Sequence, residues 1–392
     1  MNFLSRDSDL RELIFMAIIA VIFFTLRWTL TWIGGYSELA YTILIFGILV
    51  LGFDIFVGLT GYLSFGHAAF WGIGAYACAL SLANVSNNIF IAMVIAVLIV
   101  TVVALLMGLI SLRRQGIYFS ILTLAFAEMF YFLALAPLSR WTNGDDGYTG
   151  AETVHPHLFG IDMLHGINLY TFVVIIAVLA VFLARLIKRS PYGLMLRAIN
   201  SNEVRMTYTG LNVYFYKVMA FVISGMFGGV AGALFAVHER YVPVSSLHWP
   251  VSGEVVIMAV IGGFGTLIGP MIGTGIVLYL ENVLSAITGQ WGIILGAIFM
   301  SFVIFLRGGI MDLPRGVRKL LETLQAKPRT WFVVIAFVAL WIALVLQFVF
   351  PEAGVSFQND VVSTDISLGA IIAFVVAIVT IIANAFMDSR KS

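Results

Sequence analysis

Charged residues are scarce in this sequence. Asp, Glu, Lys and Arg together make up 10% of the 392 residues, whereas hydrophobic residues make up 61%. A soluble globular chain carries about 25% charged residues, because even a chain with a large apolar interior needs a polar surface to cover it. The shortage of charge excludes an ordinary soluble protein and indicates that lipid surrounds most of the surface.

Three further absences narrow the function. The formal net charge is +1 and no basic run alternates with aromatic residues, so we expect no nucleic-acid partner. The single cysteine, Cys78, excludes a disulfide within the chain. No Gly-x4-Gly-Lys-Ser/Thr phosphate loop occurs, and no metal-ligand cluster or nucleophile–base pair stands out. We therefore expect no cofactor, no bound metal and no catalysis, so that any ATP hydrolysis takes place on separate subunits.

Apolar runs, by contrast, are abundant. A helix needs about 20 apolar residues to cross a hydrocarbon core of about 30 Å. Stretches of that kind occur at 13–34, 39–58, 90–111, 116–137, 167–187, 213–237, 267–287, 292–309, 330–350 and 367–387. Two shorter segments, 66–84 and 252–264, are rich in glycine and predict short or broken helices. The expected fold is an all-α polytopic transmembrane bundle of about ten core spans, some of them broken, with two extra C-terminal spans.

The positive charges orient this bundle. If both short segments cross, the chain crosses twelve times and both termini lie on one side. All but three of the 21 Lys and Arg residues then fall on that side. The exceptions are Arg27, within the first span, and Arg140 and Arg240, on the other side. Because short loops rich in Lys and Arg stay in the cytoplasm, we expect both termini to be cytoplasmic.

The predicted spans divide the chain into three parts. Residues 1–310 form the transmembrane domain, which contains a cytoplasmic loop at 188–212. Residues 311–329 form a basic cytoplasmic linker. Residues 330–392 form a C-terminal extension with two predicted spans.

Loop 188–212 has helical signals of its own. Asn200 and Glu203 have the spacing of a capping box, and Gly210 suits a helix C-terminus. A short amphipathic helix here would present Arg197, Glu203 and Arg205 to the cytoplasm. The residues alone leave two interpretations open, a solvated connector and a docking helix for a soluble partner.

Two glycine-rich interruptions are the candidates for a transport pathway. They are 58–76 and 252–275, one in each half of the chain. Irregular backbone at membrane depth must be buried in protein or line a watery path, because its unpaired groups are costly in lipid. Paired interruptions in two halves of a transporter indicate its binding site. Alternatively, the glycines only allow close helix packing.

Several polar residues accompany these interruptions. His67 follows Ser64 and Gly66 where a broken helix would begin, and it has an alternative role as a hydrogen-bond partner of neighbouring backbone. Ser252 suits an N-cap with Glu254 in the first turn. Asp54 and Glu128 lie deep within spans, where carboxylates mark pathways, proton sites or structural pairs. The pathway candidates are Ser64, Gly66, His67, Glu128, Glu254, Gly262 and Gly263.

Four segments, in order along the chain, resemble one family. They are GLTGYLSFGHAAFWGIGAY, RRQGIYFSILTLAFAEMFYFLAL with TNGDDGYTG, SPYGLMLRAINSNEVRMTYTGLNVYFYK, and LHWPVSGEVVIMAVIGGFGTLIGPMIG. They are similar to the LivM-like permease subunits of ATP-binding-cassette (ABC) importers for branched-chain amino acids. The similarity covers roughly residues 40–310 and leaves some 80 later residues unexplained.

The resemblance implies a transport assembly in a bacterial inner membrane. Its expected partners are a second homologous permease subunit, two cytoplasmic ATPase subunits, a periplasmic substrate-binding protein and membrane lipid. The family's pathway segment corresponds to Ser64, Gly66 and His67. Its ATPase-coupling loop corresponds to Arg197, Ser201, Glu203 and Gly210, and its external loop to Asp145 and Asp146.

Other functions remain open from the sequence. A permease for urea, amides or other amino acids has similar motifs. An ion-coupled secondary transporter would use Asp54 or Glu128 as its proton site. A membrane scaffold or assembly protein is a third class.

Overall fold

The computed structural model describes residues 6–32, 34–150, 154, 156–158, 161–163, 166–287, 291–305, 308–312, 354–355 and 366–367. They fall into two compact units, the first Met1–Tyr279 with Gly309–Met311, and the second Leu280–Gly308 with Asp312–Ser392. The linker after Asp312 and the C-terminal spans 330–350 and 367–387 lie outside the described residues, apart from Ser367. Those two predictions therefore remain untested.

Seven described helices are long and apolar enough to cross a membrane. They are α1 (Arg6–Trp32), α2 (Ser37–Thr60), α4 (Ile89–Ser111), α5 (Ile117–Leu135), α7 (Ile167–Arg189), α10 (Val213–Glu239) and α12 (Ile268–Ile287). Each corresponds, within two residues at either end of the span, to one of the predicted spans or extends beyond it. The all-α polytopic bundle is confirmed, while the count of twelve crossings stays a prediction.

Shorter elements complete the first unit. They are α3 (His67–Asn84), α6 (Ser139–Thr142), α8 (Pro191–Ser201), α9 (Glu203–Tyr208), α11 (Trp249–Gly262), the 3-10 helices η1 (Gly144–Asp146) and η2 (Val244–Leu247), and the paired strands β1 (His157–Leu158) and β2 (Ile161–Asp162). The second unit contains α12 beyond Tyr279, α13 (Trp291–Phe305) and the paired strands β3 (Gly354–Val355) and β4 (Ile366–Ser367). A further 3-10 helix, η3, is formed by Ile310–Asp312.

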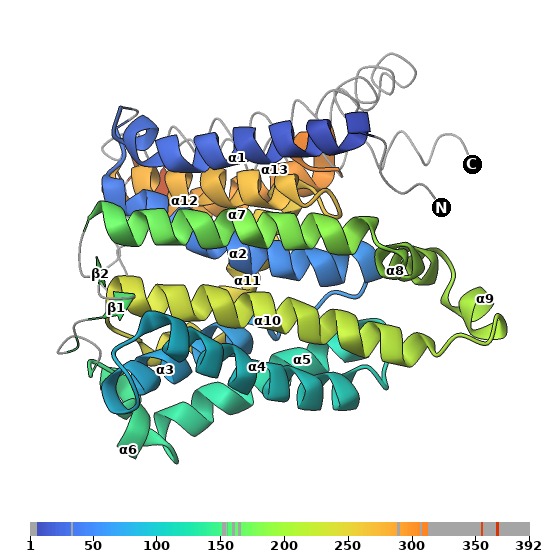
Figure 1. The fold of residues 1–392 in the computed structure, drawn as a ribbon, viewed down its shortest axis with the longest axis horizontal. Helices are drawn as coiled ribbons and strands as arrows, with labels where there is room; N and C mark the ends of the chain where they lie inside the picture. The colour runs from blue at the N-terminus through green and yellow to red at the C-terminus, as the bar shows by residue number, and fades with distance from the viewer. Residues whose placement is uncertain are drawn as a thin grey trace. The chain divides into compact units, whose positions relative to one another are not determined.

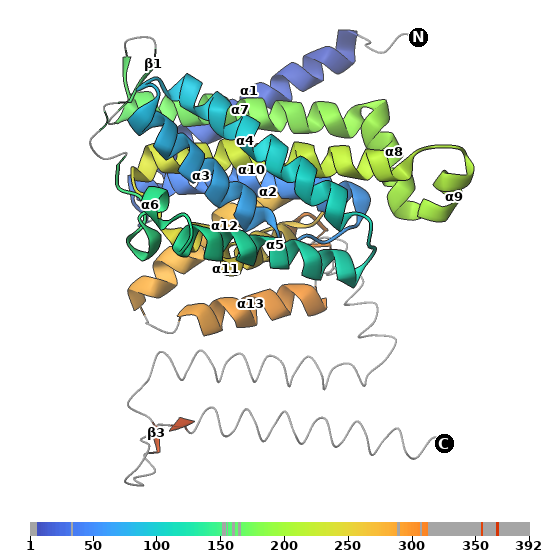
Figure 2. The same cartoon turned by 90° about the horizontal axis from the view of Figure 1, so that it is seen from below.

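Helix α10 is the centre of the first unit. It packs against α2, α3 and α4, and Figures 1 and 2 show α10 running beside these helices. The contact with α3 is close because both helices carry glycine there. A Cβ atom on Gly74 of α3 would lie 2.7 Å from the carbonyl oxygen of Gly229 in α10. These two glycines therefore permit helix packing, which was one of the two interpretations of the glycine-rich segments.

The two ends of the bundle differ. Figure 1 places α8 and α9 beyond one end of α7 and α2, which we call the loop end. It places α6, β1 and β2 at the other end, which we call the far end. The chain reaches the loop end at Thr60, Arg189 and Val213, the ends of α2 and α7 and the start of α10.

Two predicted helix caps are wrong. Ser252 does not cap α11, because that helix begins earlier at Trp249 with Pro250 in its first turn, where proline fits best. The predicted capping box of Asn200 and Glu203 is also absent. Ser190 and Pro191 begin α8, which runs on to Ser201. Asn202 then starts α9, and its side chain accepts a hydrogen bond from the Arg205 N–H.

Candidate functional site at the interrupted helices

The helices α3 and α11 both begin about halfway through the bundle. His67, the first residue of α3, bonds Ser224, which lies eleven residues after Val213 at the loop end of α10. The backbone N–H of Trp249, the first residue of α11, bonds Glu128, eleven residues after Ile117 at the start of α5. Eleven residues of helix rise about 16 Å. Helix α11 has 14 residues, so it is too short to cross the bilayer alone.

The start of α3 is capped by other helices. The Ala68 N–H donates to Ser252 Oγ of α11 at 2.9 Å. The segment just before it is held by α5, where the Phe65 N–H donates to Thr123 Oγ1 at 3.1 Å and Ser120 Oγ donates to the Leu63 carbonyl at 2.6 Å. Ser252 therefore caps α3 rather than its own helix, and Leu63 and Phe65 in the interruption each have a backbone group paired within protein.

His67 lies in the core beside these caps. Its side chain is fully buried, and its Nε2 lies 2.7 Å from Ser224 Oγ. Ser224 donates its one hydroxyl hydrogen to the Gly52 carbonyl at 2.7 Å, so His67 Nε2 must carry the proton of their shared bond. Nδ1 is then an acceptor, and it has no hydrogen-bond partner among the described residues. The ring also meets Phe53 and Phe70 edge-on.

Glu128 caps the start of α11. Its Oε1 accepts the Trp249 N–H at 3.0 Å and lies 2.8 Å from His248 Nδ1. A carboxylate at a helix N-terminus is stabilised by the helix dipole and by the free N–H groups there. Glu128 therefore has a clear structural partner, and its proposed part in a pathway stays a prediction.

Asp54 holds the connection between α11 and α12. It is fully buried, and its two oxygens accept the N–H groups of Gly265 at 2.6 Å and Leu267 at 3.0 Å. Lys188, the first residue of the predicted loop 188–212, lies in the structure in the last turn of α7 and donates to the Gly265 carbonyl. Gly58, one turn after Asp54, allows Gly265 to approach α2 this closely. A Cβ atom on Gly58 would lie 2.6 Å from the Gly265 nitrogen.

The other predicted pathway residues occupy the same two interruptions. Ser64 is fully buried and accepts the Gly66 N–H at 3.2 Å. Gly262 and Gly263 are buried at the end of α11, where Gly263 has a φ of +101°. Glu254 is half-buried within α11. The structure thus brings the two interruptions together through Ala68 and Ser252, while a role of these residues in substrate transfer stays a prediction.

Glu203 is partly buried and paired within the structure, whereas the sequence predicts that it is presented on the surface of the loop. Its Oε1 forms a salt bridge of 2.6 Å with Lys217 Nζ in α10 and accepts Gln115 Nε2 at 3.2 Å. Its Oε2 accepts the Tyr62 hydroxyl at 2.5 Å, and Lys217 Nζ donates to the same hydroxyl at 3.2 Å. The side chain of Lys217 is 3% exposed and that of Glu203 24%. We call Tyr62, Glu203 and Lys217 the loop-end cluster.

Tyr62 acts as a neutral donor in the loop-end cluster. Burial, and then the hydrogen bond to the Glu203 carboxylate, raise the pKa of the Tyr62 hydroxyl above its ordinary value. Sequence reasoning missed Tyr62 and Lys217. A lysine four residues into an apolar span was the available signal, since such a charge requires a partner.

The outer face of loop 188–212 is open. Its exposed side chains include the predicted coupling residues Arg197 and Ser201. Large apolar side chains lie beside them, with Leu194 61%, Val204 64% and Tyr208 87% exposed. Gly210, with a φ of +81°, follows the end of α9 as predicted. Apolar groups that project from a surface rimmed by polar residues mark sites of protein contact.

At the far end, Asp145 and Asp146 are exposed. They lie in η1, and the loop that carries them is tied to the turn after α10. Tyr148 pairs with Val242 through both backbone hydrogen bonds, and Tyr241 donates its hydroxyl to the Asp146 carbonyl at 3.1 Å. The carboxylates themselves are thus presented from an ordered loop.

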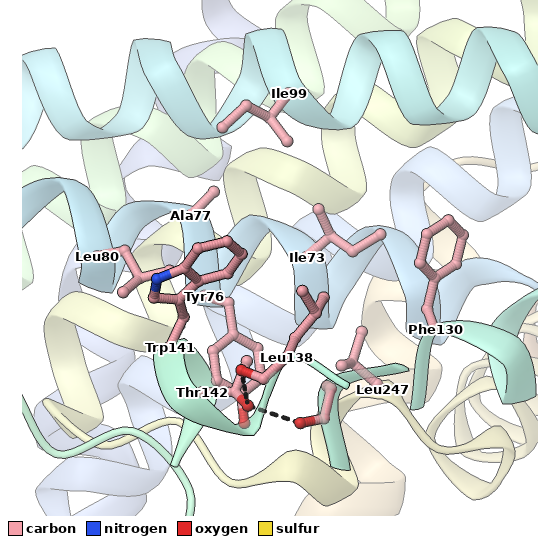
Figure 3. Close-up of a pocket in the computed structure, with 11 residues that line it drawn as sticks. Ile73, Tyr76, Ala77, Leu80, Ile99, Phe130, Leu138, Trp141, Thr142 and Leu247 are labelled. Atoms are coloured by element: carbon pink, nitrogen blue, oxygen red, sulfur yellow. Dashed lines mark hydrogen bonds between the residues drawn. The ribbon is translucent and has the colours of Figure 1, made fainter. Parts of the chain in front are cut away.

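A separate cavity lies between α3, α4, α5 and α6 (Figure 3). It has a volume of about 230 Å³, and its lining is apolar or aromatic apart from Thr142. The Thr142 hydroxyl is already engaged with the carbonyls of Ala134 and Leu138, at 2.6 and 3.0 Å. Side chains on its rim, such as Trp141 and Ile99, are exposed. The side chains that line the cavity include none that is charged, so an ion pair with the charged groups of an amino acid has no partner there.

Comparison with known proteins gives consistent matches. The profile of the family described as "Branched-chain amino acid transport system / permease component" matches residues 35–311. The chain is 26% identical to the high-affinity branched-chain amino acid transport system permease protein LivM of Salmonella typhimurium, over 82% of this chain and 79% of that protein. It is also 26% identical to LivM of Escherichia coli, over 80% of this chain and 78% of that protein. No solved structure gives a significant match.

Proposed function

Because this chain belongs to the family of branched-chain amino acid transport permease components, we propose that it is the permease subunit of an ABC importer for branched-chain amino acids. The observation that carries the proposal is the bonding of segment 188–212, which starts in the last turn of α7, to both interruptions. Lys188 bonds the Gly265 carbonyl and Glu203 bonds Tyr62. An importer driven by separate ATPase subunits needs such a connection between the loop that contacts the ATPase and the transport pathway.

The energy source and the delivery of substrate belong to other chains. Two cytoplasmic ATPase subunits would bind and hydrolyse ATP, because this chain has no phosphate loop. A second homologous permease subunit would complete the pathway, and a periplasmic binding protein would deliver the substrate. The protein would lie in a bacterial inner membrane with both termini and the loop end in the cytoplasm.

The outer face of loop 188–212 is the proposed contact with the ATPase. Arg197, Ser201 and Gly210 would contribute to it together with the exposed Val204 and Tyr208. Aromatic and arginine side chains carry much of the energy in protein interfaces. Glu203 would act behind this face, on the pathway side of the loop.

The proposed pathway passes the starts of α3 and α11 and the end of α11. The residues proposed to line it are Ser64, Gly66, His67, Glu128 and Glu254 near the two starts, and Gly262 and Gly263 at the end of α11. The first turn of α3 contains no acidic residue, so the positive end of its dipole is not neutralised there. Transporters use such half-helix N-termini to receive substrate carboxylates. At the far end, the exposed Asp145 and Asp146 would contribute to docking of the binding protein.

The geometry disfavours an ion-coupled secondary transporter. Asp54 accepts two backbone N–H groups and Glu128 accepts one, together with a contact to His248. Both carboxylates therefore have structural roles that explain their presence within apolar spans. The choice between branched-chain amino acids and related substrates rests with the binding protein, and binding assays on that protein would decide it.

Co-purification with the ATPase subunits tests the proposal. Tyr208→Ala removes the most exposed aromatic group of the loop, so we expect the ATPase to be retained about ten-fold less. Thr207→Ala is the matched control, because Thr207 is exposed on α9 and, among the described residues, its hydroxyl bonds the Glu203 backbone carbonyl alone. Equal retention of ATPase by wild type and Tyr208→Ala would contradict the proposed contact.

A further inference from the structure

We propose that the loop-end cluster of Tyr62, Glu203 and Lys217 transmits movement of loop 188–212 to the interruption at 61–66 that precedes His67. This inference rests on the proposed function, since it assigns the residues through which ATPase movement would reach the pathway. It makes Glu203 a positioning residue inside the permease rather than a contact of the ATPase.

The three residues come from three different segments. Tyr62 lies in the interruption between α2 and α3, Glu203 begins α9, and Lys217 lies in the first turns of α10. Each is hydrogen-bonded to the other two, at 2.5, 2.6 and 3.2 Å. The Lys217 ammonium also lies 4.6 Å from the centre of the Tyr62 ring. The cluster is therefore a closed triangle, so displacement of one member changes both of its bonds.

The burial of Lys217 makes this connection stiff. Its side chain is 3% exposed, and Glu203 is its ion-pair partner. If Glu203 moved away alone, a buried ammonium would lose its counter-charge in a medium of low dielectric constant, which is strongly unfavourable. Glu203 and Lys217 are thus expected to move together, whereas purely apolar contacts at this place would be free to slide.

The loop touches the interruption at a second point. Gly61 packs against the Asn200 side chain at the end of α8, and the space there leaves no room for a Cβ atom. Two contacts on neighbouring residues, Gly61 and Tyr62, fix the direction of the segment as well as its position.

From Tyr62 the connection continues toward the pathway. The next residues, Leu63 and Phe65, bond Ser120 and Thr123 of α5 through their backbone groups. His67 follows at the start of α3. Because these bonds tie residues 63–65 to α5, movement of Tyr62 with the loop would shift the start of α3 together with the attached part of α5.

A variant that lacks both charges can show whether the cluster transmits movement or only stabilises the fold. A buried ion pair is often replaceable by apolar residues of similar size without loss of stability, whereas removal of one partner alone is harmful. The double variant Glu203→Leu with Lys217→Met keeps the packing and removes the electrostatic connection. If the cluster serves only folding, this variant transports normally.

The test uses the complete complex in lipid vesicles. ATP hydrolysis and leucine uptake are measured in the same vesicles, and ATPase content is measured by co-purification. We expect the double variant to retain its ATPase and hydrolyse ATP, while uptake per ATP falls about ten-fold. Tyr62→Phe, which removes a single hydroxyl, should lower the same ratio with an unchanged melting temperature. Thr207→Ala is the control on the same helix.

The outcomes separate the two claims. If the wild-type complex assembles but shows no ATP-dependent uptake, the proposed function itself fails. If the wild type transports and both the double variant and Tyr62→Phe keep the wild-type ratio of uptake to hydrolysis, transmission through the cluster is overturned. If the double variant does not fold, the ratio in Tyr62→Phe decides the question.

Discussion

Asp54 is a buried carboxylate whose position in an apolar span suggested a proton site. Its partners give it a different role, because both oxygens accept backbone N–H groups of the connection that precedes α12. Glu128 is similar, since it caps the start of α11. At the scale of single residues, the polar groups of this membrane domain pair the backbone where helices are interrupted, as the absence of water in a bilayer requires.

The role of Asp54 leads to a stability prediction. Asp54→Asn replaces one acceptor oxygen by an NH₂ group and leaves the N–H of Gly265 or Leu267 without a partner. A buried unsatisfied donor destabilises by about 1–3 kcal/mol, so the melting temperature in detergent should fall. Asp145→Asn is the matched control on an exposed carboxylate. An unchanged melting temperature together with lost uptake in Asp54→Asn would support a proton site instead.

The sequence could place polar residues in spans, but it could not assign their partners. Glu128 and His248 are separated by 120 positions, and Asp54 and Leu267 by 213. Local patterns carry no information about such contacts. The sequence predicts that Ser252 caps α11, but its hydroxyl oxygen accepts the Ala68 N–H at the start of α3. The local pattern around Glu203 predicts an outward face, because its partner Lys217 lies fourteen residues later, in another helix.

At the scale of elements, helix positions followed from hydropathy with small errors. All ten predicted segments before residue 310, including 66–84 and 252–264, correspond to described helices. Local sequence was also enough for the end of α9 at Gly210. Local sequence was not enough to place the starts of α8 and α9. Ser190, Asn200 and Asn202 can all cap a helix, and only the fold selects Ser190 and Asn202.

Close packing of α3 on α10 gives a prediction at this scale. A methyl group on Gly74 would lie 2.7 Å from the Gly229 carbonyl, so Gly74→Ala must push the two helices apart. Such overpacking destabilises by about 1–3 kcal/mol. Gly253→Ala is the control, since a Cβ on Gly253 of α11 meets nothing within 4 Å. Equal thermal stability of the two variants would contradict the packing of α3 on α10.

At the scale of the whole molecule, the loop end and the far end would have different tasks under the proposed function. The loop end carries the exposed face of α8 and α9, and the far end carries Asp145 and Asp146. The interruptions between them are connected to the loop by Lys188 and by the loop-end cluster. The fold thus supports the passage of mechanical movement from one surface to the middle of the bundle.

The opposite placement of the two ends can be checked by labelling. Ser201→Cys should react with an impermeant thiol reagent only from the cytoplasm, and Asp145→Cys only from the periplasm. The native Cys78 is buried, so the unchanged protein should give little background. Labelling of both variants from the same side would contradict the proposed orientation.

The most direct test of the central claim is leucine uptake by vesicles that contain the purified complex and its binding protein. If the chain is an ABC importer permease, uptake requires ATP and intact ATPase subunits, and it continues when a proton ionophore abolishes the proton gradient. Uptake that collapses with the ionophore, yet persists without any ATPase subunit, would contradict the account.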